Sequence, residues 1–124
     1  MSSTVLVVED SNAAREVVMR ILQHEGYNVI GASNGVEALD QLHSKIPDLV
    51  LLDVMMPEMD GLTLLQELRH EPQYKELPVI LLTALSDEPR MNRARELGVR
   101  EYLVKTRFSY DELLDQVGKH VIRH

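Results

Sequence analysis

The chain has 124 residues, of which 44% are hydrophobic, and this suits a single domain with one packed core. Its formal net charge of −7 disfavours a nucleic-acid-binding surface, and the absence of cysteine excludes disulfides and thiolate metal sites. Acidic side chains occur too near the start for a signal peptide, and no apolar run approaches the ~20 residues of a membrane helix. We therefore expect one soluble, cytoplasmic domain over residues 1–124 that binds neither membrane nor nucleic acid.

Short apolar runs alternate with longer amphipathic stretches from the start of the chain. Val5–Val8 predicts a buried strand, because the run is short and rich in β-branched residues. A helix follows it, with Ser11 or Asn12 as its N-cap and Gly26 as its stop. Asn28–Ile30 predicts a second strand, and its lower apolar content places it at an edge of the sheet.

The alternation continues through the middle of the chain. A second helix opens at Asn34 and ends before Pro47. Leu49–Leu52 is apolar throughout, which predicts a third strand that is buried on both faces. After a long loop, leucines at helical spacing predict a third helix that begins at Gly61 and is broken by Pro72.

Two further strand–helix pairs complete the pattern. Val79–Leu82 predicts a fourth strand, and Ser86 or Asp87 caps the helix after it. Glu101–Val104 predicts a fifth strand, and Ser109 starts the last helix. Strands that alternate with helices need right-handed crossover connections. We therefore predict an α/β fold, with a doubly wound five-stranded parallel sheet covered by five helices.

Polar side chains stand where the apolar runs end. They are Glu9 and Asp10 after the first strand, Asp53 at the end of the third, Thr83 at the end of the fourth and Lys105 after the fifth. Open parallel sheets bind their ligands at the carboxyl edge, where all of these residues would meet. Mg²⁺ prefers oxygen ligands, and three acids at one point repel one another without a cation. The pattern therefore predicts a Mg²⁺-assisted phosphorylation site on Asp53.

Each of these residues also has a simpler interpretation. The acids after the first strand can stabilise a helix start through its dipole, but this explains one carboxylate and not three. Lys105 can form a plain salt bridge with Asp53, and the two roles can hold at different times. Thr83 can be an ordinary β-branched residue at a strand end. The metal site accounts for all of them together, so we favour it.

The same residues resemble the motifs of response-regulator receiver domains, the CheY-like family of two-component signalling. The matching elements, in chain order, are Glu9-Asp10, Asp53 with Pro57 and Gly61 behind it, Thr83-Ala84, and Tyr102 two residues before Lys105. The resemblance covers the whole chain, and these elements in order, each at the end of its own strand, are together specific. It implies a flavodoxin-like three-layer sandwich with strand order 2-1-3-4-5.

The resemblance also implies a phosphoryl-transfer site. Asp53 accepts a phosphoryl group from a histidine kinase or a histidine phosphotransfer protein, with Mg²⁺ or alternatively Mn²⁺ as cofactor. The implied metal ligands are Glu9, Asp10, Asp53 and the backbone carbonyl of Met55. Lys105 and Thr83 contact the phosphoryl oxygens. Transfer is mostly positioning and charge neutralisation, so we expect a signalling switch that promotes its own phosphorylation and dephosphorylation, and not an enzyme.

Phosphorylation must then be passed on, and the resemblance implies how. Thr83 moves toward the phosphoryl group and Tyr102 turns inward, which shifts a pre-existing equilibrium. The affected surface consists of residues 87–98, 101–104 and 110–122. Output then goes to an unknown protein target by direct contact, from a monomer or from a dimer that forms on phosphorylation. A simpler interpretation of Tyr102 is a half-buried aromatic residue on an edge strand.

Two features near the site concern lifetime and backbone geometry. Met55 and Leu85 flank the phosphoryl group in the family and control the access of water, and both are apolar here. We therefore expect slow self-dephosphorylation. The family usually has proline after the lysine, often with a cis bond, but Thr106 follows Lys105 in this chain. A non-proline cis bond costs roughly 3 kcal/mol, so we expect a trans bond, or else a strained cis one.

Three other classes of protein fit parts of the pattern. A pseudo-receiver, acting as a phosphorylation-independent interaction module, shares the fold but usually lacks one of the acids. A Mg²⁺-dependent phosphohydrolase of the haloacid-dehalogenase type needs an Asp-x-Asp signature, and Met55 stands two residues after Asp53. A flavodoxin-like cofactor carrier needs a phosphate-binding loop where Glu9 and Asp10 would repel a phosphate.

Two further expectations concern the surface. Met19 lies off the apolar stripe of the first helix, and with Ala14 and Val17 it can form an apolar patch on which a kinase or phosphotransfer helix docks. The alternative is that these are core or scattered surface residues. The five histidines are dispersed without ligand spacing. We expect them at the surface, and none of them as a phosphodonor.

Overall fold

The computed structural model describes residues 3–54, 56, 61–83, 88–99, 101–104 and 108–120, apart from the side chains of Glu88 and Arg90. Strands and helices alternate from β1 (Thr4–Val8) to α5 (Tyr110–His120). The elements between them are α1 (Asn12–His24), β2 (Asn28–Ala32), α2 (Gly35–Ser44), β3 (Leu49–Asp53), α3 (Gly61–His70), the short 3₁₀ helix η1 (Pro72–Tyr74), β4 (Val79–Thr83), α4 (Glu88–Glu96) and β5 (Glu101–Val104).

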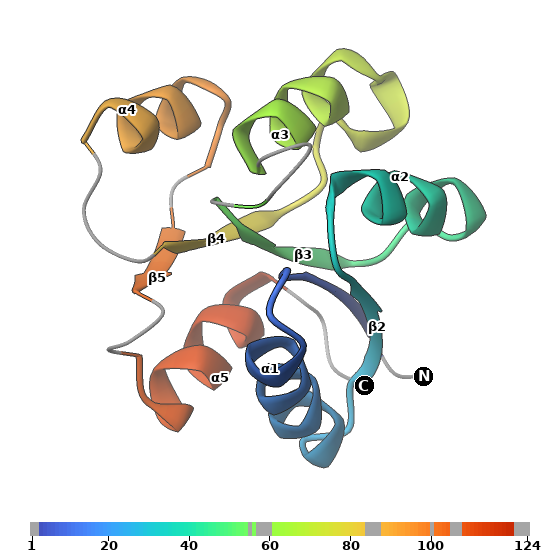
Figure 1. Ribbon diagram of the computed structural model, residues 1–124, viewed down its shortest axis with the longest axis vertical. Helices are drawn as coiled ribbons and strands as arrows, with labels where there is room; N and C mark the ends of the chain where they lie inside the picture. Colours follow the sequence, from blue (N-terminus) through green and yellow to red (C-terminus); the bar gives the residue numbers. More distant parts are fainter. Residues whose placement is uncertain are drawn as a thin grey trace.

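The five strands form one parallel sheet in the order β2-β1-β3-β4-β5. Figure 1 shows α1 and α5 on one face of the sheet and α2, α3 and α4 on the other. The predicted doubly wound α/β fold and its strand order are confirmed, and the Asn28 strand lies at an edge. The longest described helix, α1, has 13 residues, and no described helix is both long and apolar enough to cross a membrane.

The three central strands are buried on both faces. Every residue of β1, β3 and β4 is buried, because helices cover both sides of the sheet. Along β1, Val5 and Val7 pack toward α1 and α5, whereas Leu6 and Val8 pack toward the helices of the other face. Each fully buried side chain of this size stabilises the fold by about 1.5–3 kcal/mol. The strand ends are therefore fixed in position.

Side-chain caps define the helix starts. The side chains of Ser11, Asn34 and Ser109 each accept a hydrogen bond from the backbone N–H three residues on, at 3.2, 2.9 and 3.1 Å. Ser11 is thus the cap of α1, and Gly26 follows that helix with a φ of 94°, as expected for a glycine stop. The predicted cap of α4, at residues 86–87, lies outside the described residues.

The structure differs from the sequence-based expectations in strand length. β2 runs on to Ala32, and β3 and β4 include Asp53 and Thr83, because the ladder hydrogen bonds depend on the backbone and continue after the apolar run stops. The 3₁₀ helix η1 was not predicted. It begins at Pro72, because proline suits the first position of such a turn.

Two surface expectations are corrected. Met19, on α1, is partly buried and packs against the hydrophobic core, and its sulfur lies 2.8 Å from where a Cβ at Gly31 would be. It therefore covers β2 and does not join Val17, which is 57% exposed, in a free apolar patch. His120 is only half-exposed, and its Nε2 lies 3.1 Å from a carboxylate oxygen of Glu101. His24, His43 and His70 are exposed, and His124 lies outside the described residues.

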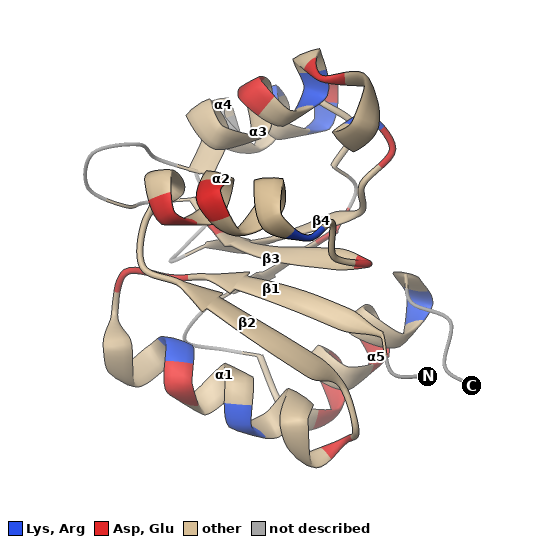
Figure 2. Cartoon of the chain, turned by 90° about the vertical axis from the view of Figure 1, so that its right-hand side faces the viewer, with Lys and Arg blue, Asp and Glu red and all other residues tan. Residues whose placement is uncertain are grey.

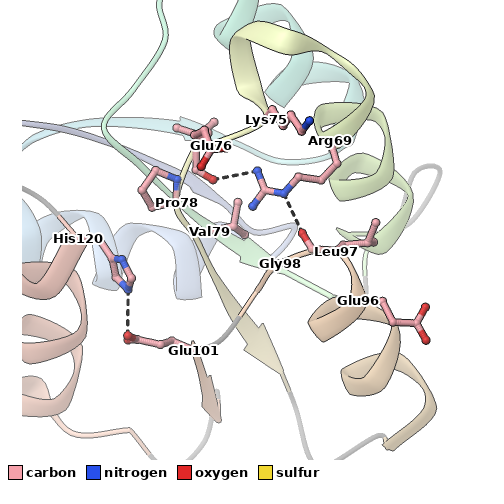
Figure 3. Close-up of a pocket in the computed structure, with 11 residues that line it drawn as sticks. Arg69, Lys75, Glu76, Pro78, Val79, Glu96, Leu97, Gly98, Glu101 and His120 are labelled. Carbon is pink, nitrogen blue, oxygen red and sulfur yellow. Dashed lines mark hydrogen bonds and ion pairs between the residues drawn. The ribbon is translucent and has the colours of Figure 1, made fainter.

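Arg69 joins three segments at the amino edge of the sheet. Its guanidinium donates to the carbonyl oxygens of Leu97 at 2.8 Å and of Tyr74 and Leu77 at 3.0 Å each. Figure 3 shows this side chain reaching from α3 toward the end of α4. Burial lowers the pKa of Arg69, although the group stays charged. The end of α4 is thereby fixed to α3 and to the segment before β4.

The start of α3 lies directly against the end of β3. A Cβ at Gly61 would be 2.3 Å from the carbonyl oxygen of Asp53 and 3.0 Å from the Cα of Val54. The N–H of Gly61 donates to the carbonyl of Val54 at 3.0 Å. Only glycine fits this approach without a shift of the Asp53 backbone.

Replacing Gly61 with Ala should therefore lower the free energy of unfolding by roughly 1–3 kcal/mol, since overpacking at a backbone contact forces the chain apart. Gly118→Ala is the matched control, because no atom lies within 4 Å of the new Cβ and position 118 is helical. That variant should gain about 0.5–1 kcal/mol. Urea unfolding followed by circular dichroism measures both, and a gain for Gly61→Ala would contradict the packing described.

Candidate functional site

The register of the sheet brings the ends of three strands together. β1 and β3 are in register through the pair Val8 and Leu52, so the residues that follow, Glu9 and Asp53, lie side by side at the carboxyl edge. β4 is the neighbour of β3 and ends at the same edge with Thr83. The backbone pairing alone therefore places two acids and a hydroxyl at one point.

Three carboxylates converge at this point. Glu9, Asp10 and Asp53 each offer an oxygen, and these oxygens all lie within 4.8 Å of one another. Glu9 and Asp53 are each 1% exposed, whereas Asp10 is exposed. Water therefore reaches the cluster mainly from the side of Asp10.

The carboxylate of Glu9 is held by backbone groups around it. The Oε2 atom of Glu9 accepts a hydrogen bond from the N–H of Ser11 at 3.1 Å, and the backbone N–H of Glu9 donates to the carbonyl of Ala32 at 3.0 Å. The cap of α1 is the hydroxyl of Ser11, so capping does not account for the neighbouring acids. The helix start accounts for the position of one carboxylate and not for the convergence of three.

A divalent cation fits this set of donors. Two unit charges at such a distance repel each other on the order of 3 kcal/mol at an effective dielectric constant of about 20. A positively charged side chain, proton uptake or a bound cation each lowers that cost. Three carboxylate oxygens with solvent on one side match the needs of Mg²⁺, which takes oxygen ligands and keeps several waters.

The residues expected to respond to a phosphoryl group lie on β4, which is next to β3, and on β5, the edge strand beyond it. Thr83 is 4% exposed at the end of β4. Tyr102 lies on the edge strand β5, where it pairs with Leu81 and is 46% exposed. In this structure the Tyr102 side chain therefore belongs to the surface.

Several predicted site residues lie outside the described part of the chain. They are Lys105, Met55 and Leu85, together with Pro57, Ala84 and the peptide bond between Lys105 and Thr106. Their expected roles in charge neutralisation, metal binding and phosphoryl lifetime remain predictions.

One residue beside the site was missed by the sequence analysis. Arg15 donates from Nη1 to the carbonyl oxygen of Glu9 at 2.8 Å. Figure 2 shows a basic band near the start of α1, next to the acidic connection from β1. The only signal in the sequence is an arginine in the first turns of a helix that begins at an acidic loop, and such arginines are common on helix surfaces.

A cavity of about 570 Å³ lies elsewhere, at the amino edge of the sheet (Figure 3). Its lining includes Val79 and Glu101, which are the first residues of β4 and β5, and also His120 at the end of α5. These are the opposite ends of the strands from Thr83 and Asp53, so the cavity is separate from the acidic cluster.

Comparison with known sequences gives a consistent family. The model of the response regulator receiver domain matches residues 5–118. Response regulator MprA of Mycobacterium tuberculosis is 42% identical over 114 residues, which are 92% of this chain and 48% of that protein. The chain thus spans about half the length of the curated relatives it matches.

Solved structures agree with this assignment. Chemotaxis protein CheY4 of Vibrio cholerae superposes with a TM-score of 0.91 at 31% identity, covering 98% of this chain and 100% of that one. The Mn²⁺-bound form of response regulator Rcp1 gives a TM-score of 0.79 at 31% identity, covering 90% of this chain and 86% of that one. The sequence match and the fold together mean that this chain belongs to the response-regulator receiver domains, the CheY-like domains of two-component systems.

Proposed function

We propose that this chain accepts a phosphoryl group on Asp53 in a Mg²⁺-dependent reaction and passes the signal on by protein contact. The observation that supports this most strongly is the convergence of three carboxylate oxygens within 4.8 Å, two of them on buried residues. A pseudo-receiver usually lacks one of these acids, whereas all three are present and converge in this chain.

The proposed metal ligands are the carboxylates of Glu9, Asp10 and Asp53, with the carbonyl of Met55 as a further ligand. When bound, Mg²⁺ supplies the positive charge that lets an anionic carboxylate approach an anionic phosphoryl group. Mn²⁺ is the proposed substitute, in keeping with the Mn²⁺-bound form of the related Rcp1.

Asp53 is the proposed nucleophile. One of its carboxylate oxygens forms a bond to phosphorus, while the bond from phosphorus to a partner's histidine nitrogen breaks and its electron pair stays on the imidazole. The product on this chain is an acyl phosphate. Lys105 contributes a flexible point charge toward the phosphoryl oxygens, and Thr83 donates its hydroxyl. The partner is a histidine kinase or a histidine phosphotransfer protein, as the membership of this chain in the response-regulator family suggests.

The proposed readout links Thr83 to Tyr102. Thr83 ends β4, and Tyr102 lies on the neighbouring strand β5 with its side chain 46% exposed. Movement of Thr83 toward the phosphoryl group would therefore leave space on the strand next to Tyr102. Inward rotation of Tyr102 then changes the surface formed by α4, β5 and α5. Because the curated relatives are about twice as long as this chain, the nature of the output is part of the proposal.

Incubation with acetyl phosphate and Mg²⁺ should add the mass of one phosphoryl group to the intact protein, and a chelator should abolish the addition. Asp53→Asn removes the nucleophile and should gain no mass. Asp40→Asn is the matched control, because Asp40 is an exposed acid on α2, and it should behave as the parent chain does. Equal phosphorylation of Asp53→Asn, or of the parent chain without a divalent ion, would refute the proposal.

Beryllofluoride with Mg²⁺ mimics the phosphoryl group and should change the environment of Tyr102. We expect the ¹⁹F resonance of a fluorotyrosine at this position to shift on saturation. Tyr74 is the internal control, because it lies outside the α4, β5 and α5 surface, is buried, and its hydroxyl donates to the carbonyl of Leu42 at 3.1 Å. A Tyr102 resonance that stays in place while the mimic is bound would rule out the switch role.

A further inference from the structure

Arg15 makes two polar contacts that link the acidic loop to the first helix. Nη1 donates to the carbonyl oxygen of Glu9 at 2.8 Å, and Nη2 donates to the side-chain oxygen of Asn12 at 2.6 Å. Because the guanidinium is planar and presents its donors in a fixed fork, both contacts set the position of one side chain. Arg15 therefore connects the loop that carries Glu9 to the start of α1.

The aliphatic part of Arg15 lies across the edge strand β2. A Cβ at Gly31 would be 3.3 Å from Cδ of Arg15, which is tighter than ordinary van der Waals contact. Glycine at this position thus leaves room for the arginine on the strand. Arg15 is half-buried as a result, and its reach toward Glu9 is restricted to few rotamers.

The backbone of Glu9 is therefore held on both sides. Its N–H donates to the carbonyl of Ala32 on β2 at 3.0 Å, and its carbonyl accepts from Arg15. The charge of Arg15 also reaches the next loop: hydrogen bonds from Ser33 lower the pKa of Glu37, and the field of Arg15 lowers it further. The permanent positive charge of Arg15 thus lies next to the backbone of the acidic loop.

From these contacts we propose that Arg15 is a positioning residue for the metal site, which fixes the Glu9 backbone so that the carboxylates of Glu9 and Asp10 stay directed at Asp53. This inference rests on the proposed metal-dependent function. It predicts that the loss of Arg15 lowers the affinity for Mg²⁺, although charge alone predicts an increase. Removing a positive charge near a cation site strengthens cation binding by Coulomb's law, whereas loss of positioning weakens it.

The test is the Mg²⁺ affinity of the full chain, measured by isothermal titration calorimetry at physiological ionic strength. Arg15→Met keeps much of the aliphatic packing and removes both hydrogen bonds, and we expect about tenfold weaker binding, the effect typical of groups that orient metal ligands. Arg15→Lys keeps the charge with a single donor group and should recover part of the loss.

Arg20→Met is the matched control. Arg20 lies on the same helix, pairs with Glu16 at 2.6 Å and has a side chain that is 75% exposed, so its removal changes the net charge equally without touching the acidic loop. We expect its Mg²⁺ affinity to stay within about twofold of the parent chain, because exposed pairs contribute little. Thermal unfolding in a chelator, run in parallel, distinguishes a purely structural role from a positioning role. A purely structural role lowers stability but leaves the Mg²⁺ affinity of the folded protein unchanged.

Two results would overturn the inference. One is Mg²⁺ binding by Arg15→Met that equals or exceeds the parent affinity, and the other is an equal loss in Arg20→Met. If Arg15→Met does not fold, the comparison of Arg15→Lys with the parent chain decides instead, and unchanged affinity there counts against the proposal. Failure of the parent chain itself to bind Mg²⁺ refutes the proposed function, which these variants do not address.

Discussion

Repulsion among three carboxylates is the constraint on which the rest of the site depends. Glu9 and Asp53 are almost fully buried, so water screens their charges little, and a carboxylate oxygen of Asp10 lies within 4.8 Å of an oxygen of each. Burial of the central strands offsets the free-energy cost of this repulsion. The ends of these strands are fixed because helices cover both faces of the sheet. A stable core thus holds three acids close together, in an arrangement that could bind a divalent cation.

Two of the supporting contacts act on the backbone and not on the carboxylates themselves. Gly61 allows α3 to start against the carbonyl of Asp53, and Arg15 binds the carbonyl of Glu9 from the opposite side. Each contact fixes the backbone from which an acidic side chain extends. Neither contact neutralises a carboxylate, as the proposed binding of a cation and a phosphoryl group requires.

The sequence predicts the strands and their acids for a clear physical reason. Apolar runs such as Leu49–Leu52 mark buried strands, and parallel order sends every strand end to one edge, so Glu9, Asp10 and Asp53 must meet there. The contact of Arg15 with Glu9, the cover of Met19 over Gly31 and the pair of His120 with Glu101 were not predictable, because they depend on rotamers and on segments that meet only after folding. The close approach of Gly61 belongs with them, since a glycine after a loop also suits an ordinary turn.

Metal-dependent changes in backbone amide resonances test the central claim most directly. If the three carboxylates form one cation site, Mg²⁺ should shift the amides of residues 9–11 and 53–54 with a single affinity, and a trace of Mn²⁺ should broaden the same resonances. Amides at the opposite edge, such as those of Leu77 and Glu101 beside the cavity, should not respond. Broadening that is spread over the acidic surface, or that is centred on the amino edge, would contradict the account.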